Sequence, residues 1–159
     1  MNGTLSLAEV EVIGSPGTNT NPVVSNVALS GTATQSSTDF GVVPGRAIDG
    51  NTNGRWRAST TTHIRNSNQP WWQLRLAQTG TIEEIVLFNR TDSCCSSRLS
   101  NYTVTILNDA GRIVFTQSFG QAPSFTNTIN TGRVTGRTVR IQLNGSNALS
   151  RAEVQVMGY

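Results

Sequence analysis

Apolar and polar side chains alternate with a period of two over much of this chain. In the segment WWQLRL, Trp72, Leu74 and Leu76 share one face of an extended backbone. Similar runs rich in β-branched residues are Thr81–Asn89, Tyr102–Leu107, Arg112–Phe119, Arg137–Leu143 and Ala152–Tyr159. Gly, Asn and Asp interrupt these runs, and no stretch has the apolar stripe of an amphipathic helix. The pattern predicts an all-β chain, an antiparallel β-sandwich of the jelly-roll kind whose loops carry function.

Composition excludes several classes of protein. The chain has 159 residues, enough to bury a substantial core, and it contains no run of 18 apolar residues. Residues 1–20 also lack the charged and then apolar pattern of a signal peptide. All 12 basic residues are arginines, scattered along the chain and outnumbered by hydroxyl side chains. Nucleic-acid binders usually cluster their basic residues, so we expect no nucleic-acid partner.

A ten-residue sequence near the N-terminus recurs at the C-terminus. LSLAEVEVIG at 5–14 and LSRAEVQVMG at 149–158 match at seven of ten positions. We interpret residues 1–14 as the last strand of a preceding repeat and residues 15–22, rich in Pro, Gly and Asn, as a linker. Residues 23–159 then form one complete module. The repetition predicts a tandem array with sibling modules in the parent protein.

The chain has two cysteines, Cys94 and Cys95, and they are adjacent. A bond between neighbours closes no useful loop and gives almost no entropic stabilisation of the fold. Their Cα atoms also lie closer together than in an ordinary disulfide. Free thiols, intermolecular bonds and a vicinal disulfide that serves local shape are all compatible with these residues. A zinc site is not expected, because a Cys-Cys pair with one distant histidine lacks the ligand spacing.

A polar constellation surrounds the cysteine pair. Arg90 and Asp92 precede it, Arg98 follows it, and the single histidine, His63, lies 27 positions before Arg90. A histidine, then Arg-x-Asp with paired cysteines, then a second basic residue resembles the fucolectin family of eel-agglutinin and tachylectin-4-like lectins. The resemblance runs from about residue 26 to residue 158. These lectins are a branch of the discoidin-like sandwich of coagulation-factor C-type domains, and they also occur as fucose-binding carbohydrate-binding modules.

The resemblance implies a fucose pocket made by His63, Arg90 and Arg98. It also implies a vicinal disulfide between Cys94 and Cys95, packed on the apolar side of the sugar. The chemistry of these residue types suits L-fucose. Arginine presents a rigid fork of donors, and a neutral imidazole accepts from a hydroxyl. The C6 methyl group of the sugar needs an apolar wall beside these polar groups.

One residue departs from the family pattern. Ser93 separates Asp92 from the cysteines, so Arg98 lies one position later than the resemblance implies. We expect Asp92 to orient Arg90 and not to touch the sugar itself.

The three tryptophans are predicted to differ in role. Trp71 and Trp72 begin an alternating strand and are expected to belong to the core or its margin. Trp56 lies shortly before His63 and is expected to line the mouth of the pocket.

A structural calcium ion is a further implication of the resemblance. The sequence DGN at 49–51 alone is typical of a plain turn, but fucolectins hold calcium with this loop and a glutamate of the final strand. The implied ligands are the side chains of Asp49, Asn51, Thr60 and Glu153 and the carbonyls of Arg46 and Ala152, with Ser59 replacing Thr60 if the register shifts. Such an ion would tie the loop that carries His63 to the C-terminal strand.

The sequence favours a binding module over an enzyme. It shows no nucleophile motif, and no pair of carboxylates is assigned to opposite sides of a sugar. We therefore predict non-catalytic binding of L-fucose or fucosylated oligosaccharides by a secreted protein of bacterial origin.

Three alternatives stay open. A sulfated fucan would use Arg55, Arg57 and Arg65 near the His63 loop. A phospholipid-binding discoidin-type module would insert Trp56 into a membrane, which we consider the lesser possibility. A structural adhesin domain would have no fucose site.

Overall fold

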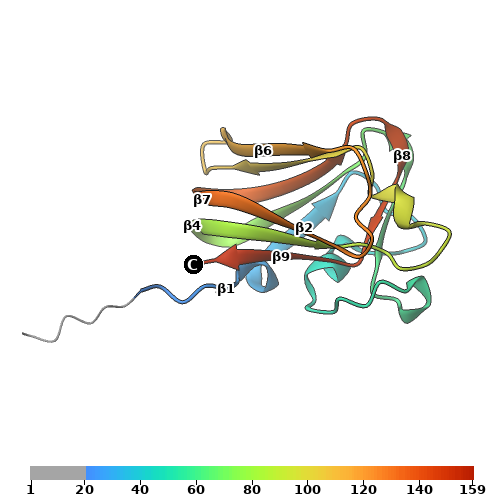
Figure 1. Ribbon diagram of the computed structural model, residues 1–159, viewed down its shortest axis with the longest axis horizontal. Coiled ribbons are helices and arrows are strands. Elements are labelled where there is room, and N and C mark those ends of the chain that lie inside the picture. The colour runs from blue at the N-terminus through green and yellow to red at the C-terminus, as the bar shows by residue number, and fades with distance from the viewer. Residues whose placement is uncertain (1–20) are drawn as a thin grey trace, which may run out of the picture.

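The computed structural model describes residues 21–159 (Figure 1). The strands are β1 (Ser25–Asn26), β2 (Thr32–Gln35), β3 (Thr62–Asn68), β4 (Trp71–Phe88), β5 (Tyr102–Leu107), β6 (Ile113–Phe119), β7 (Thr126–Leu143), β8 (Ser146–Arg151) and β9 (Glu153–Gly158). Short 3-10 helices are η1 (Val27–Ser30), η2 (Pro44–Ile48), η3 (Trp56–Ala58) and η4 (Ser96–Arg98). Across residues 21–159, no helix has the length and apolarity needed to cross a membrane. The repeat copy at 1–14 and most of the predicted linker lie outside the described residues.

Two long strands, β4 and β7, build both layers of the sandwich (Figure 1). The first half of β4 lies in a layer with the order β2-β4-β7-β5-β6, and its second half lies in a layer with the order β1-β9-β4-β7. The register of β4 against β7 shifts between Arg75 and Gly80, where the strand passes from one layer to the other. All of these strand pairs are antiparallel, which confirms the predicted β-sandwich.

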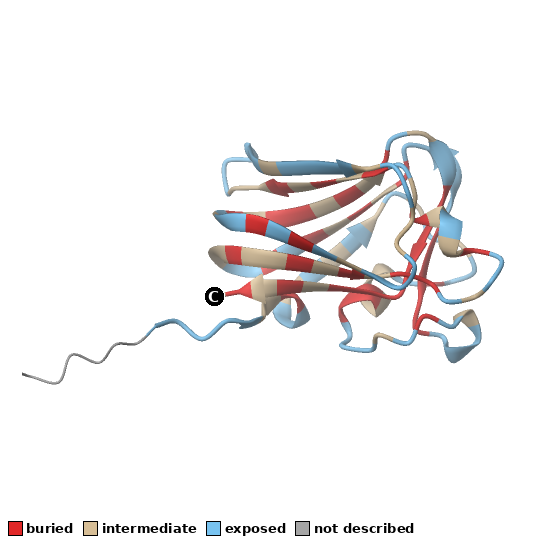
Figure 2. Cartoon of the chain, in the orientation of Figure 1, coloured by how far each residue is buried: buried red, intermediate tan, exposed pale blue. Residues whose placement is uncertain are grey.

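The buried core lies on the face of the strands that the period-two pattern predicts. Trp72 and Leu74 are fully buried and Leu76 nearly so, while Arg75 between them is exposed. Bands of buried and exposed residues alternate along β4 and β7 (Figure 2). Each fully buried large apolar side chain contributes about 1.5–3 kcal/mol relative to exposure. Trp72 belongs to this core, and its indole N–H donates to the carbonyl of Pro44 at 3.1 Å.

Several strand boundaries differ from the prediction. The two runs predicted at 71–76 and 81–89 form the single strand β4, because the backbone continues through the Gly80 region as a bulge instead of turning. Strands β2, β3 and β8 were not predicted, because their polar sequences lack alternation. Strands β3 and β8 pair as a separate two-stranded sheet, and this pairing sets His63 opposite Ser150. The β3–β8 pair, which the sequence did not predict, therefore carries His63 of the candidate site.

Candidate functional site

Three loops meet beside strand β3 and form a pocket of about 290 Å³. The first loop precedes η2, the second contains η3, and the third follows β4 and contains η4. The lining residues are Phe40, Trp56, His63, Arg90, Cys94, Cys95 and Arg98. The structure thus brings together every residue that the sequence assigns to sugar contact and adds Phe40.

His63 and Arg98 form a polar pair in this pocket. Nη1 of Arg98 lies 3.2 Å from Nδ1 of His63. Because a guanidinium can only donate, Nδ1 accepts and the imidazole proton resides on Nε2, which lies 3.8 Å from the carboxylate of Asp39. Burial, reinforced by the charge of Arg98, holds the pKa of His63 below its usual value, although Asp39 acts in the opposite direction. The ring is therefore neutral at pH 7.

Arg90 is held in one orientation by Asp92. Its Nε and Nη2 donate to Oδ2 of Asp92 at 3.0 and 2.7 Å. The same oxygen accepts from the backbone N–H of Trp56 at 2.9 Å, so it connects the second loop to the third. Burial acts to raise the pKa of Asp92, but these hydrogen bonds outweigh it and lower that pKa overall. Arg90 also lies over the ring of Trp56, with 4.9 Å between guanidinium carbon and ring centre.

Cys94 and Cys95 are joined by a vicinal disulfide, which resolves the alternatives that the sequence left open. The backbone N–H of Cys95 donates to the carbonyl of Asp92, and that of Arg98 donates to the carbonyl of Cys95. This pair of tight turns accommodates the additional Ser93. Both the disulfide and Arg98 still line the pocket.

Phe40 completes an aromatic wall that the sequence analysis missed. Its ring centre lies 5.3 Å from that of His63 and 5.8 Å from that of Trp56. The side chain is 73% exposed, and its backbone has a left-handed φ of 53°. The only sequence feature that could have indicated Phe40 is that it is a large aromatic residue between polar residues and a glycine. It belongs to no family motif, and only the fold brings its loop to the pocket.

Close backbone contact fixes the second loop against the third. The carbonyl of Gly54 accepts from the N–H of Thr91 at 2.9 Å. A Cβ atom at Gly54 would lie 2.6 Å from the carbonyl oxygen of Asn89, so only glycine permits this approach. Asn89 is buried and donates to the carbonyls of Ser96 and Pro123, which ties the third loop to its base.

Two of the residues implied for calcium, Glu153 and Thr60, have side-chain oxygens whose contacts are defined. Oε1 of Glu153 accepts from the N–H of Gly50 at 2.9 Å, and Oε2 is buried with no hydrogen-bond partner in the described chain. Burial, reinforced by the nearby charge of Asp49, raises the pKa of Glu153 to about 7. The Thr60 hydroxyl donates to the carbonyl of Asn53, a residue that the sequence did not assign. Among residues 21–159, no cluster of three or more His, Cys, Asp or Glu residues forms a metal site.

Other candidate residues lie away from the pocket. Trp71 and Trp72 belong to the sheet, as predicted. Arg55, Arg57 and Arg65 are exposed and do not line the pocket.

The fold and the pocket define a discoidin-like β-sandwich module with a polar site on its loops, and known proteins share this fold. Residues 46–141 match the F5/F8 type C family profile described as a NedA-like, galactose-binding domain. Fucolectin-1 of Anguilla japonica is 40% identical over 88 residues, which cover 52% of this chain and 49% of the fucolectin. The chain thus spans about half the length of the curated relatives it matches.

Solved structures extend the similarity to the whole described module. A fucose-binding module of Streptococcus pneumoniae, SpX-3, superposes with a TM-score of 0.81 at 38% identity, covering 85% of this chain and 98% of that module. The lectin domain of lectinolysin, solved with Lewis b antigen, gives a TM-score of 0.79 at 33% identity, covering 83% of this chain and 95% of that domain. The chain belongs to the F5/F8 type C family, in its fucolectin branch.

Proposed function

We propose that this module binds L-fucose at the ends of glycans in the pocket formed by His63, Arg90 and Arg98. The observation that carries the proposal is that oriented, charged donors face an apolar wall within one small pocket. The donors suit ring and hydroxyl oxygens, and the disulfide with the aromatic rings suits the C6 methyl group. Relatives described as fucose-binding and as a complex with Lewis b support the same ligand class.

The proposed activity is binding without catalysis. A glycosidase places two carboxyl groups on opposite sides of the scissile bond. None of the described residues that line this pocket is acidic, and the nearby Asp92 is already bonded to Arg90. The relatives reported above are lectins and binding modules.

The expected affinity gives a reason for repetition. A hexose has about a dozen heavy atoms, and at ~0.3–0.5 kcal/mol each the dissociation constant lies between tens of micromolar and about a millimolar. Sibling modules in a tandem array would convert such weak contacts into avidity. We propose that the parent protein is secreted and of bacterial origin and carries more than one copy.

Calorimetry with three sugars tests the proposal. L-Fucose and L-galactose differ only in a hydroxyl group at C6, and D-galactose tests the stereochemistry. We expect heat with L-fucose and about 10-fold or more weaker binding of L-galactose, because its added hydroxyl would be buried against the apolar wall. Absence of heat with both L-fucose and fucosylated oligosaccharides would overturn the proposed function.

We also propose a structural calcium ion near Glu153. The buried, unpartnered Oε2 and the neighbouring Asp49 fit a divalent cation, and hydroxyl and amide oxygens of the same loop fit calcium in particular. The ligands would be Asp49, Asn51, Thr60 and Glu153 by side chain and Arg46 and Ala152 by carbonyl. When bound, the ion would neutralise the two carboxylates and hold the second loop to β9. Melting curves with calcium and with excess EDTA test this, and identical melting temperatures would overturn it.

A sulfated fucan is the second candidate ligand of the pocket. Arg55, Arg57 and Arg65 are exposed, and none of the ion pairs within residues 21–159 includes them. They are therefore available to bind sulfate groups. A steep loss of affinity with salt would favour the sulfated ligand, whereas a flat salt profile would favour neutral fucose.

A further inference from the structure

The outer surface of the five-stranded layer carries an ordered set of polar side chains. Its central row follows from strand register and consists of Thr34, Gln73, Arg140, Thr105 and Thr116. A second row consists of Trp71, Gln142, Thr103 and Ser118. A third row consists of Thr32, Arg75, Thr138, Leu107 and Ile113; Thr138 in it is buried, and its last two residues are apolar. We call this surface, defined by these three rows, the polar ladder.

The polar ladder points away from the core. Successive side chains of a strand alternate between the two faces of a sheet. The residues between the ladder positions, including Trp72, Leu74, Val139 and Ile141, are buried. With strands about 4.8 Å apart, five strands make a surface roughly 19 Å wide. This width suits an extended chain better than a single small ion.

Arg140 lies at the centre of the ladder in a fixed position. Its guanidinium carbon lies 4.6 Å from the ring centre of Trp71, which restrains the side chain. The Nε atom of Arg140 is shielded from solvent and has no hydrogen-bond partner among the described residues. Arg75 is one diagonal step away across the sheet, about 7–8 Å by strand geometry.

No carboxylate belongs to the three rows of the polar ladder. The four ion pairs within residues 21–159 use Asp39, Asp92, Glu83 and Asp109 as acids, and none includes Arg75 or Arg140. Two guanidinium groups without an ion pair thus lie among hydroxyls and amides, with Trp71 beside them and Leu107 and Ile113 at one edge. The nearest acid is Asp109, which pairs with Arg137 and whose pKa the charge of Arg75 helps to lower.

From this arrangement we infer that the polar ladder binds an anionic polysaccharide, at a site separate from the fucose pocket. Arg75 and Arg140 would bind sulfate or carboxylate groups of the chain with paired N–H donors. The threonine, serine and glutamine side chains would exchange hydrogen bonds with sugar hydroxyls. The only aromatic ring of the ladder, Trp71, is covered on one side by Arg140. Nucleic-acid bases therefore have little free aromatic surface on which to stack, and a polysaccharide fits better than a single-stranded nucleic acid.

Dextran sulfate is the probe, because it is anionic and contains no fucose. We expect the whole chain to bind fluorescent dextran sulfate and not unmodified dextran, in a salt-dependent way. The double variant Arg75→Gln/Arg140→Gln should bind at least 10-fold more weakly. The matched variant Arg133→Gln removes one exposed charge from the first part of β7, outside the three rows, and should stay within 2-fold of the wild type.

Three further readouts keep the inference falsifiable. Saturating L-fucose should not displace dextran sulfate, and the ladder variant should keep its L-fucose affinity and its melting temperature within a few degrees. Arg75→Gln alone, which disturbs no cation–π contact, should still weaken binding several-fold. Equal loss in Arg75→Gln and Arg133→Gln, displacement by L-fucose, or equal affinity for a single-stranded oligonucleotide would overturn the inference.

Discussion

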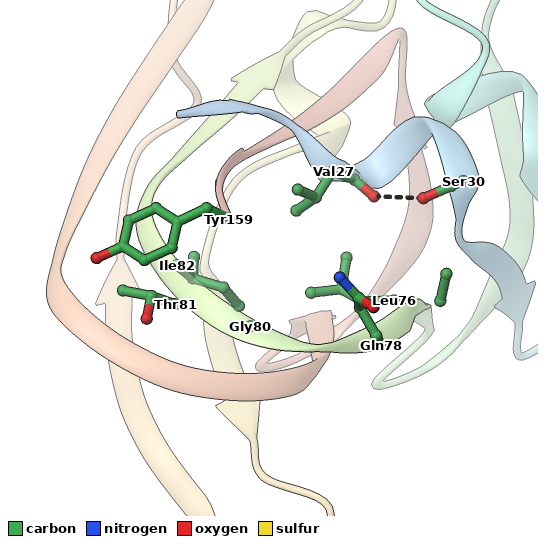
Figure 3. A pocket seen from close by; sticks show the side chains of 9 residues that line it. Val27, Ser30, Leu76, Gln78, Gly80, Thr81, Ile82 and Tyr159 are labelled. Carbon is green, nitrogen blue, oxygen red and sulfur yellow. Dashed lines mark hydrogen bonds between the residues drawn. The ribbon is translucent and has the colours of Figure 1, made fainter. Parts of the chain in front are cut away.

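Two cavities of this module have the same size, but only one of them is lined by arginines and a histidine. The proposed fucose pocket, called the fucose pocket below, and a second cavity each measure about 290 Å³. The second cavity lies where β4 changes layers, between η1 and the C-terminal Tyr159 (Figure 3). Its lining residues are Val27, Ser30, Leu76, Ala77, Gln78, Gly80, Thr81, Ile82 and Tyr159.

The second cavity offers no charged side chain among its described lining residues. Its polar groups are largely engaged within the fold. The hydroxyl of Ser30 donates to the carbonyl of Val27 (Figure 3). The backbones of Thr81 and Tyr159 exchange two hydrogen bonds. The two cavities therefore differ in their charged donors and not in their volume. The proposed fucose site is the cavity to which the loops supply oriented donors.

The largest expected effect is the loss of Arg90. Arg90→Ala removes charged donors from the fucose pocket, whose hydrogen bonds typically contribute about 1.5–3 kcal/mol each. It also removes the ion-pair partner of Asp92, which then accepts only from the backbone N–H of Trp56. We expect L-fucose affinity to fall about 100-fold or more, so that calorimetry detects no heat. The matched change in the second cavity, Tyr159→Ala, should leave affinity within 2-fold. Similar losses in both variants would mean that the donors of the pocket are not decisive.

The next effect concerns the loop beneath the fucose pocket. In the proposed calcium site, Glu153→Gln removes a carboxylate ligand and should lower the melting temperature by about 10 °C in excess calcium. EDTA should then cause no further decrease in the variant, although it destabilises the wild type. Wild-type melting of the variant in calcium would contradict the assignment. The lining of the second cavity should be unaffected, because none of its residues belongs to the proposed ligand set.

Most of the strands that frame both cavities follow from local sequence. β5 has the predicted bounds Tyr102–Leu107, because its alternation is regular and turns flank it on both sides. β4 was predicted as two strands, because the residues around Gly80 are typical of a turn. Its continuation depends on pairing with β9 and β7, which are distant in sequence. Local propensity cannot reveal such tertiary pairing.

Most residues of the proposed fucose pocket were predicted from a family motif, and Trp56 was predicted from its position shortly before His63. His63, Arg90 and Arg98 followed from the resemblance, and the structure places them around one pocket. Phe40 could not be placed, because its contact with His63 depends on how two loops pack. The second cavity could not be predicted from the sequence, because ordinary core and turn residues line it.

The vicinal disulfide should have an intermediate effect. Replacing both cysteines, Cys94→Ser with Cys95→Ser, removes an apolar ring from the wall and loosens the turn that positions Arg98. We expect L-fucose affinity to fall about 10-fold, measured by calorimetry, with a smaller change in melting temperature, since the bond closes no loop. Affinity for L-galactose should fall less, because the lost wall faces its hydroxyl group. Unchanged L-fucose affinity would remove the disulfide from the site.

The smallest expected effect is a pH dependence of the fucose pocket, because His63 lines it and no histidine lines the second cavity. Burial and Arg98 lower the pKa of His63, so the ring should stay neutral from pH 8 down to about its ordinary value of 6.5. Below that pH, protonation removes the acceptor of Arg98 and adds a like charge beside it, and L-fucose affinity should fall several-fold.

Saturating calcium separates this titration from that of Glu153, whose carboxylate would stay ionised when the ion is bound. His63→Asn should bind more weakly and show a flat profile between pH 5 and 8 in calorimetric titrations. An acid-side loss that persists in His63→Asn would assign the titration to another group. An affinity that rises with acidity would contradict the neutral, accepting histidine on which the proposed geometry depends.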